Sequence, residues 1–224
     1  MTTQTTIDQL RQELDLALGP LGIEDRRLAR TLVRLLAGGE PVDTEHVGDA
    51  LGIPTPEAAE AIARLPWVYR DEGDRVIGAW GMSVADLAKT PHRLILNGQE
   101  LFAWCAADAL FLPLVLGRSA QVASRCPTTG ERIRLRVGPD GIGERSPRGT
   151  VLSLLRIGED APARDAITSF CHFIHFFASG DAAEAWIARH DGTFQVSLDD
   201  AFDLARFWAE RGFGVDPDRA ASER

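Results

Sequence analysis

Two side chains that can carry a transferable proton stand three positions apart in an otherwise apolar stretch. They are Cys105 and Asp108, within residues 99–113, where Gln99 and Glu100 at the start are the other strongly polar residues. In a helix, residues three apart lie on one face, so the thiol and the carboxyl would be neighbours. Burial disfavours a charged carboxylate, so it raises the pKa toward the range in which the group can hold and pass a proton. The spacing therefore favours proton chemistry beside a thiol.

A purely structural interpretation of this pair stays open at this point. A reduced cysteine is often simply a small buried residue, and an aspartate near a helix end often forms a local hydrogen bond. The chain has two further cysteines, Cys126 and Cys171, far from Cys105 and from each other. An odd number of cysteines without a CxxC pair indicates reduced thiols, which must pack, bind metal or react.

The overall composition sets limits on the class of protein. The 224 residues are long enough for one large domain or two small ones. A formal net charge of −9 argues against a general nucleic-acid binder, because such proteins need a cationic surface to displace counterions. Residues 1–8 have neither the basic nor the apolar region of a signal peptide, and no stretch is long enough to span a membrane. Together with the reduced thiols, these features predict a cytoplasmic protein.

Thiols in apolar surroundings, one with a carboxyl nearby, favour a soft metal, whereas carboxylates alone would suit magnesium or calcium. A structural zinc site needs a set of closely spaced ligands, and residues 126–130 lack a second cysteine. A thiol hydrolase would use Cys171 with His172 or His175, but no orienting third residue accompanies them. The sequence has no glycine-rich phosphate loop, which argues against nucleotide chemistry.

Residues 1–85 are predicted to form a winged-helix-like domain, in which helices precede a hairpin. The helices are expected over residues 7–18, 25–37, 44–52 and 55–65, and the hairpin over residues 68–80. Within residues 1–80, eight arginines and no lysine stand against 14 acidic residues. DNA phosphates would be repelled by such a surface, so this domain is predicted to be structural and not to bind DNA.

Residues 86–224 are predicted to form a catalytic α+β domain, a mostly antiparallel sheet with flanking helices, which carries the thiols. Strands are expected over residues 92–96, 99–102, 121–125, 132–137 and 150–157, and late helices over residues 181–190 and 198–211. The Asn97-Gly98 dipeptide predicts a tight hairpin turn that leads into the Cys105 segment. Pro113 and then Gly117 are expected to limit the helix after Cys105, and residues 138–143 are expected to be a loop.

Three blocks of the sequence resemble the organomercurial (alkylmercury) lyases. The blocks are residues 101–108, 126–130 and 169–179. They hold the cysteines of that family in order and at similar spacing, and the resemblance covers most of residues 28–208. One departure is His172, where some members carry another cysteine. That difference concerns an adjacent thiol and leaves the pair Cys105 and Cys171 in place.

The resemblance implies a winged-helix-like N-terminal part that does not read DNA, in agreement with the charge count above. It implies an enzyme that cleaves the carbon–mercury bond of organomercurials by protonolysis, giving a hydrocarbon and Hg(II). Cys105 and Cys171 would bind the mercury, and Asp108 would handle the proton within reach of the same metal. Soft sulfur donors suit this ion. No organic cofactor is implied, and a mercuric reductase or low-molecular-weight thiols would accept the released Hg(II).

The other residues of the blocks are expected to be structural. Cys126 lies at a strand-to-turn corner and is not one of the reacting pair. Trp104 and Phe173 are expected to form pocket walls or core, and His175 to be a core or supporting histidine. Two alternatives to an enzyme stay open: a soft-metal-responsive winged-helix transcription regulator, and a non-catalytic soft-metal binder. The acidic helix over residues 55–65 argues against the regulator.

Overall fold

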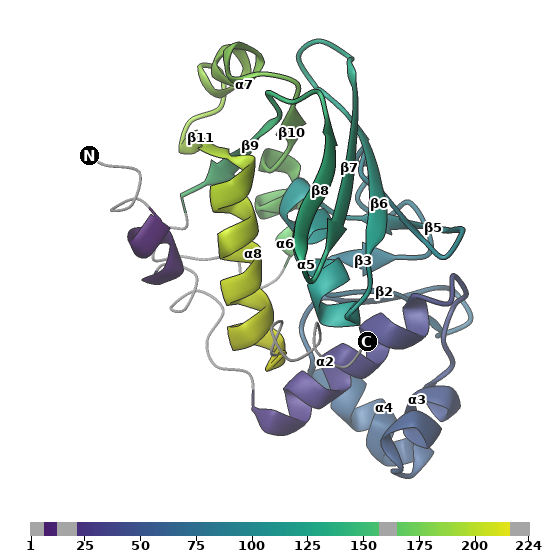
Figure 1. The fold of residues 1–224 in the computed structure, drawn as a ribbon. Coiled ribbons are helices and arrows are strands. Elements are labelled where there is room, and N and C mark those ends of the chain that lie inside the picture. Colours follow the sequence, from purple (N-terminus) through teal and green to yellow (C-terminus); the bar gives the residue numbers. More distant parts are fainter. Residues whose placement is uncertain (1–6, 13–21, 157–164, 216–224) are drawn as a thin grey trace.

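The computed structural model describes residues 7–12, 22–156 and 165–215 of the chain (Figure 1). The described part combines helices with one eight-stranded and one three-stranded antiparallel sheet. This confirms the α+β class. Residues 7–12 are helical, and residues 13–18 of the helix expected there lie outside the described part. Among the described residues, no helix has both the length and the apolar character needed to cross a membrane.

The helices of the described part carry the labels of Figure 1. They are α2 (Ile23–Leu36), α3 (Thr44–Leu51), α4 (Thr55–Arg64), α5 (Ala106–Leu116), α6 (Ala166–Ser169), α7 (Gly180–Ile187) and α8 (Leu198–Phe213), with a short 3-10 helix η1 (Cys171–Phe173). The strands of the larger sheet are β1 (Val68–Arg70), β2 (Val76–Ala79), β3 (Met82–Ser83), β4 (Arg93–Leu96), β5 (Gln99–Ala103), β6 (Ala120–Arg125), β7 (Arg132–Gly138) and β8 (Gly141–Ser146). Those of the smaller sheet are β9 (Val151–Leu155), β10 (Phe176–Phe177) and β11 (Thr193–Ser197).

The larger sheet has the strand order β1-β2-β3-β5-β4-β6-β7-β8. Its first three strands follow α2, α3 and α4, which lie together at one end of the molecule (Figure 1). Met82 of β3 pairs with Ala103 of β5, so the N-terminal strands are hydrogen-bonded to the strand that leads to Cys105. The N-terminal strands therefore lie next to the segment that carries Cys105.

The hairpin between β4 and β5 has the predicted two-residue turn. Asn97 and Gly98 both have positive φ, at 52° and 83°. Two successive residues in this conformation match the right-handed twist of paired strands, which is why Asn-Gly is favoured there. The turn fixes the register of β5, in which Leu96 faces Gln99, and thereby the position at which the chain enters α5.

Helix α5 is apolar on all sides and packs against α8, α2 and the strands β5 and β7. It ends at Gly117, which has a left-handed conformation as helix C-caps often do. The prediction that Pro113 limits the helix was wrong, because Pro113 lies inside it. Proline removes one helical hydrogen bond. Burial of nearly every neighbouring side chain keeps the segment helical despite that loss.

The prediction of a loop over residues 138–143 was also wrong. Strand β7 continues to Gly138 and β8 begins at Gly141, so the two residues between them form a tight turn. Gly141 has a φ of 128°, a conformation that is accessible to glycine and rare for other residues. The glycine-rich stretch that was expected to be a loop is therefore part of a β-hairpin.

Helix α8 runs along α5 and joins the N-terminal part to the rest of the core (Figure 1). The ring of Phe213 near its end lies 5.5 Å from Trp80 and 5.6 Å from Phe111, measured between ring centroids. Phe213 is fully buried. Burying an aromatic side chain of this size stabilises a fold by about 1.5–3 kcal/mol. The contact connects the turn after β2, α5 and α8.

Candidate active site

Cys105 occupies the N-cap of α5, between the end of β5 and the first helical residue. Its backbone is extended, with φ −147° and ψ 176°, and its Sγ accepts a hydrogen bond from the backbone N–H of Asp108 at 3.4 Å. This is the contact that a serine or aspartate makes at a helix start, here made by sulfur. The unpaired N–H groups and the dipole of a helix N-terminus favour negative charge at this position.

Cys171 reaches the same place from a distant part of the chain, at the start of η1. The backbone N–H of Ala106 donates to the carbonyl of Ile174 at 3.1 Å, which joins η1 to the first turn of α5. From β9, the Ser153 hydroxyl donates to the carbonyl of Phe173 at 2.8 Å. These contacts hold the Cys171 segment against the segment that carries Cys105.

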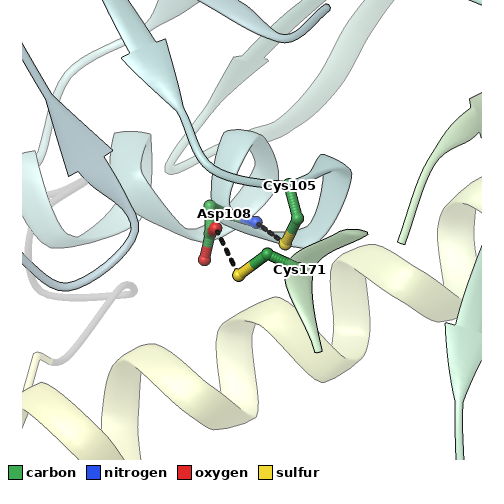
Figure 2. A group of neighbouring side chains, drawn as sticks. All are labelled: Cys105, Asp108 and Cys171. Carbon is green, nitrogen blue, oxygen red and sulfur yellow. Dashed lines mark hydrogen bonds between the residues drawn. The ribbon is translucent and has the colours of Figure 1, made fainter. Parts of the chain in front are cut away.

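The two thiols and the Asp108 carboxyl converge in this structure (Figure 2). The Cys171 thiol donates a hydrogen bond to Asp108 Oδ2 at 3.8 Å, and the three metal-binding atoms all lie within 4.8 Å of one another. Metal–thiolate bonds are about 2.3 Å long in zinc sites, so one ion can bridge sulfurs about 4.6 Å apart. Cys105 and Cys171 are buried and Asp108 is partly buried. The group is therefore suited to a soft metal shielded from water.

The apolar surroundings change the protonation of all three groups. Burial raises the pKa of Asp108 from 3.8 to about 7, against hydrogen bonds from Cys105 and Cys171 that lower it. Burial is the largest reason that the pKa of Cys105 lies well above its usual range. A hydrogen bond with Cys105 lowers the pKa of Cys171, but burial and the Asp108 charge together leave it raised. The group therefore retains protons at neutral pH, and its members titrate together.

Gly81 lies directly against the Asp108 carboxyl. It lies in the two-residue turn between β2 and β3 and has a φ of 94°. A Cβ atom built on Gly81 would lie 2.5 Å from Asp108 Oδ1, closer than real Cβ contacts. The carbonyl of Gly81 also accepts the backbone N–H of Trp104 at 2.9 Å. The absence of a side chain at this turn therefore makes room for the carboxyl.

Trp104, the residue directly before Cys105, packs against Tyr69. Trp104 is buried, and its Nε1 donates to the Ser83 hydroxyl at 3.3 Å. The ring of Tyr69 meets that of Trp104 edge to face, with centroids 5.1 Å apart and an interplanar angle of 89°. The Tyr69 hydroxyl donates to Asp165 Oδ1 at 3.3 Å. Burial and the Asp165 charge raise the pKa of Tyr69 to about 12, so this hydroxyl remains protonated.

The other cysteine and the nearby histidines lie outside the converged group. Cys126 is buried directly after β6, where burial raises its pKa but hydrogen bonds from the following turn and from the backbone of Ala178 lower it overall. His172 Nε2 donates to the carbonyl of Ala88 at 2.9 Å. His175 Nε2 donates to the carbonyl of His172 at 2.8 Å, and its ring stacks on that of His92 with centroids 5.7 Å apart. These contacts match the core and supporting positions expected for Cys126 and His175.

Comparisons with known proteins agree with this geometry. The model of the alkylmercury lyase family, MerB, matches residues 86–210. An alkylmercury lyase from Bacillus cereus is 40% identical over 184 residues, which cover 82% of this chain and 81% of that protein. The chain belongs to the alkylmercury lyase family. A relative of the same name from Streptomyces lividans is 37% identical over 200 residues, covering 88% of this chain and 90% of that protein.

A solved structure shares the fold of nearly the whole chain. It is described as the mercury-bound form of MerB2, and it matches with a TM-score of 0.73 and 25% sequence identity. The match covers 92% of this chain and 99% of that one. Cys105, Asp108 and Cys171 lie within the segment matched by the alkylmercury lyase model, whereas Tyr69 and Gly81 lie before it.

The structure brings together the three site residues named from the sequence and adds three that were missed. The additions are Gly81, Tyr69 and Asp165. Gly81 lies against Asp108, the Tyr69 ring packs on Trp104, and Asp165 accepts a hydrogen bond from Tyr69. A glycine after an apolar strand was a signal for the turn at Gly81, although not for its contact with a carboxyl. Nothing in the local sequence pattern marks Tyr69 or Asp165.

Proposed function

We propose that this chain is an alkylmercury lyase, which breaks the carbon–mercury bond of an organomercurial and releases a hydrocarbon and Hg(II). One observation carries the proposal: two buried thiols and a carboxyl with a pKa of about 7 meet at bridging distance, from segments 63 residues apart. Membership in the alkylmercury lyase family supports it. Thiolate sulfur is the ligand that soft metals prefer.

In the proposed first stage, the two cysteines capture the organomercurial. One sulfur forms a bond to mercury, and the leaving group of the substrate departs with the proton of that thiol. The second sulfur then bonds to the same mercury and releases its own proton. The hydrogen bond from Cys171 to Asp108 gives that proton a direct path to the carboxylate. Sulfur donation to mercury increases the electron density on the bound carbon.

In the second stage, Asp108 delivers the proton to that carbon. The electron pair of the carbon–mercury bond becomes the new carbon–hydrogen bond, the hydrocarbon leaves, and Hg(II) stays on the two thiolates. A carboxyl with an ordinary pKa of 3.8 would lose the proton accepted from Cys171 to water at neutral pH, whereas Asp108, with a pKa of about 7, can accept that proton as a carboxylate and hold it until it is transferred to carbon. Acid catalysis is most efficient when the pKa lies near the working pH.

The remaining assignments complete the proposal. Asp108 contacts the mercury with the two sulfurs, no organic cofactor takes part, and the enzyme works in the cytoplasm. External low-molecular-weight thiols or a mercuric reductase accept the Hg(II), and neither nucleic acid nor a membrane is involved. Residues 1–85 form a structural winged-helix-like domain, and residues 86–224 form the catalytic domain. The excess of acidic over basic residues within residues 1–80 supports a role other than DNA binding.

Gas-chromatographic detection of methane or benzene tests the proposal, with purified protein, excess thiol and a methyl- or phenylmercury salt. The wild type is expected to release the hydrocarbon, and Cys105→Ser, Cys171→Ser and Asp108→Ala are expected to release none while remaining folded. Cys126→Ser is the matched control, because it changes a buried cysteine outside the site. Wild-type turnover by Cys171→Ser would rule out the two-thiol scheme. A folded wild type that binds a stoichiometric mercurial without releasing hydrocarbon would be a binder and not a lyase.

A further inference from the structure

A hydrogen-bonded pair, Tyr69 and Asp165, spans the two chain segments that carry the site sulfurs. On one side, the Tyr69 ring packs edge to face against Trp104, the residue directly before Cys105, with centroids 5.1 Å apart. On the other side, the Tyr69 hydroxyl donates to Asp165 Oδ1 at 3.3 Å. Asp165 comes directly before α6, the helix that leads to Cys171. One side chain of β1 therefore contacts both segments.

Asp165 is well anchored in its own segment. Its carboxylate caps α6 by accepting the backbone N–H of Ile167 at 3.1 Å and that of Thr168 at 3.4 Å. The Thr168 hydroxyl donates to the second oxygen at 2.7 Å. Because the carboxylate is fixed to α6, a restraint on Asp165 also restrains the start of the segment that ends at Cys171.

The pair is close enough to the Cys171 thiol to interact with it electrostatically. The charge of Cys171 adds to burial and to the effect of Asp165 in raising the pKa of Tyr69 to about 12. The hydrogen bond with Cys105 lowers the pKa of Cys171, whereas burial, Asp108 and, to a smaller extent, Asp165 raise it. Tyr69 therefore stays a hydrogen-bond donor throughout the neutral range, and the contact with Asp165 persists there.

We propose that Tyr69 is a positioning residue that holds the Cys171 segment at bridging distance from Cys105. This inference rests on the proposed lyase function. Rates in active sites fall by about 100-fold for a displacement of about 1 Å. Loss of the Tyr69 hydroxyl would leave capture by one sulfur intact and slow the steps that need both. The turnover number kcat is then expected to fall by about tenfold, with a much smaller change in KM.

Three variants test this role. Tyr69→Phe keeps the ring on Trp104 and removes the hydroxyl. Asp165→Asn keeps both an acceptor for Tyr69 and a helix cap, so it is expected to behave like the wild type. Thr168→Ala is the matched control, because it removes a contact of the same carboxylate without touching Tyr69. Circular dichroism and thermal unfolding check that each variant is folded.

Two readouts are needed, namely steady-state kinetics and the ultraviolet charge-transfer band of Hg(II) bound from HgCl2 to two thiolates. Tyr69→Phe is expected to lower kcat about tenfold and to weaken the two-thiolate band at one equivalent of Hg(II). A folded Tyr69→Phe protein with wild-type kcat and band would overturn the inference, as would an equal loss in Thr168→Ala. Because the band does not depend on turnover, it tests the positioning role even if the wild type releases no hydrocarbon, which would refute the lyase function alone.

A second feature, independent of the thiol site, is an arginine-lined cavity over strands β4, β6 and β7. Its volume is about 410 Å³, and its lining includes Arg93, Arg125, Arg132 and Arg134. The last three are exposed and lie on one face of the sheet, since alternate residues of β7 are buried on the other face. This concentration of positive charge stands on a chain whose formal net charge is −9.

Two of these arginines, Arg125 and Arg132, are placed so that their charges repel each other. Arg125 and Arg132 face each other directly in the register of β6 and β7, and like charges at such positions destabilise a sheet. In the described part of the chain, Arg93 pairs with Asp86 at 3.3 Å and with Glu100 at 3.9 Å. The ion pairs found there do not involve Arg125, Arg132 or Arg134. The Arg125 guanidinium donates a hydrogen bond to the carbonyl of Gly130 at 3.4 Å.

We infer that this cavity binds a small molecule with at least two anionic groups, carboxylates or phosphates. Guanidinium groups bind both kinds of anion in a two-pronged geometry, and a cavity of this size accommodates a small ligand. A multiply charged anion would offset the repulsion between the Arg125 and Arg132 side chains and thereby stabilise the sheet. Ligand binding is therefore expected to raise the thermal unfolding temperature.

Calorimetric titration with citrate and with inorganic pyrophosphate, at constant ionic strength, distinguishes the carboxylate from the phosphate class. Arg132→Gln is expected to weaken binding of the preferred probe at least about tenfold, which corresponds to one lost charge-assisted contact. Arg136→Gln is the matched control, because Arg136 is exposed on the same strand and face but does not line the cavity. No binding of either probe at millimolar concentration, or equal losses in both variants, would overturn the inference.

Discussion

Cys171 and Asp108 are hydrogen-bonded through side chains although they stand 63 positions apart, with Sγ 3.8 Å from Oδ2. The contact joins a thiol, which would lose its proton if it bound mercury as proposed, to a carboxyl whose burial raises its pKa to about 7. A carboxyl with an ordinary pKa would release such a proton to water at once. In the proposed mechanism, this pair would provide both the route and the temporary acceptor for the proton that is transferred to carbon.

The pH dependence of the cleavage step follows from this pairing. With a mercurial already bound, the single-turnover rate is expected to fall as the pH rises through about 7, because Asp108 then loses the proton that it must deliver. Rapid-quench measurement of hydrocarbon between pH 5.5 and pH 9 would show the decline. The binding step is measured separately, since ionisation of thiols favours it at higher pH. A cleavage rate that keeps rising to pH 9 would show that Asp108 is not the proton donor.

The raised pKa of Asp108 also affects stability. The folded state holds a proton on this group between pH 3.8 and about 7, where the unfolded chain does not. Its contribution to stability is therefore present below pH 3.8 and is lost as the pH rises through about 7. Asp108→Asn has no such loss, so it is expected to unfold at a higher temperature than the wild type at pH 8.

Thermal unfolding at pH 5 and at pH 8 measures this effect. The advantage of Asp108→Asn is expected to grow by several degrees between the two, because a protein of this size shifts by about 2–4 °C per kcal/mol. The comparison at pH 5 is the internal control for any change in packing that the amide introduces. An advantage that is equal at both pH values would mean that the Asp108 carboxyl is ordinarily solvated.

Much of the local structure could be predicted, because it depends on short-range chemistry. The Asn97-Gly98 turn and the contact between Cys105 and Asp108 both follow from spacing along the chain. The position of Cys105 at the N-cap, and not within the helix, is a refinement that propensity alone does not give, because cysteine is not a typical cap. The error at Pro113 has the opposite origin, since tertiary burial of α5 overrides a local helix-ending signal.

The long-range parts of the site could not be predicted from pattern. Cys171 was paired with Cys105 through resemblance to a family, since no periodicity relates residues on different elements. Tyr69 approaches the site because β1 joins the same sheet as β5, and strand order across such a sheet is a tertiary property. Asp165 is placed by the cap of a short helix, whose four residues give no periodic signal.

Cys126 offers a test of what a buried thiol outside the site contributes. Its side chain is 1% exposed, and the turn after it is joined to α7 by a hydrogen bond of 2.7 Å from Thr128 to the carbonyl of Ala182. Cys126→Ala is expected to lower stability by about 1 kcal/mol through lost packing, seen as a drop of about 2–4 °C on heating. Hydrocarbon release should remain within twofold of the wild type. A loss of more than tenfold in a folded variant would assign Cys126 to the reaction.

Substitution of Gly81 tests the position of the Asp108 carboxyl most directly. Alanine there would place a Cβ 2.5 Å from Asp108 Oδ1, so the carboxyl would have to move away from Cys171. A displacement of about 1 Å costs about 100-fold in rate, and Gly81→Ala is expected to lose activity on that scale. The matched control is Gly98→Ala. Gly98 has a similar φ of 83°, but its Cβ would meet no atom within 4 Å.

Both variants carry the backbone strain of alanine at positive φ, which costs about 1 kcal/mol of stability. They should therefore unfold at similarly reduced temperatures, while hydrocarbon release falls by about 100-fold in Gly81→Ala alone. In the folded Gly81→Ala protein, the pH at which cleavage declines should also move, since Asp108 would leave its buried position. Equal activity in the two variants would show that the carboxyl does not need the space above Gly81, and that its placement beside Cys171 is set by α5 instead.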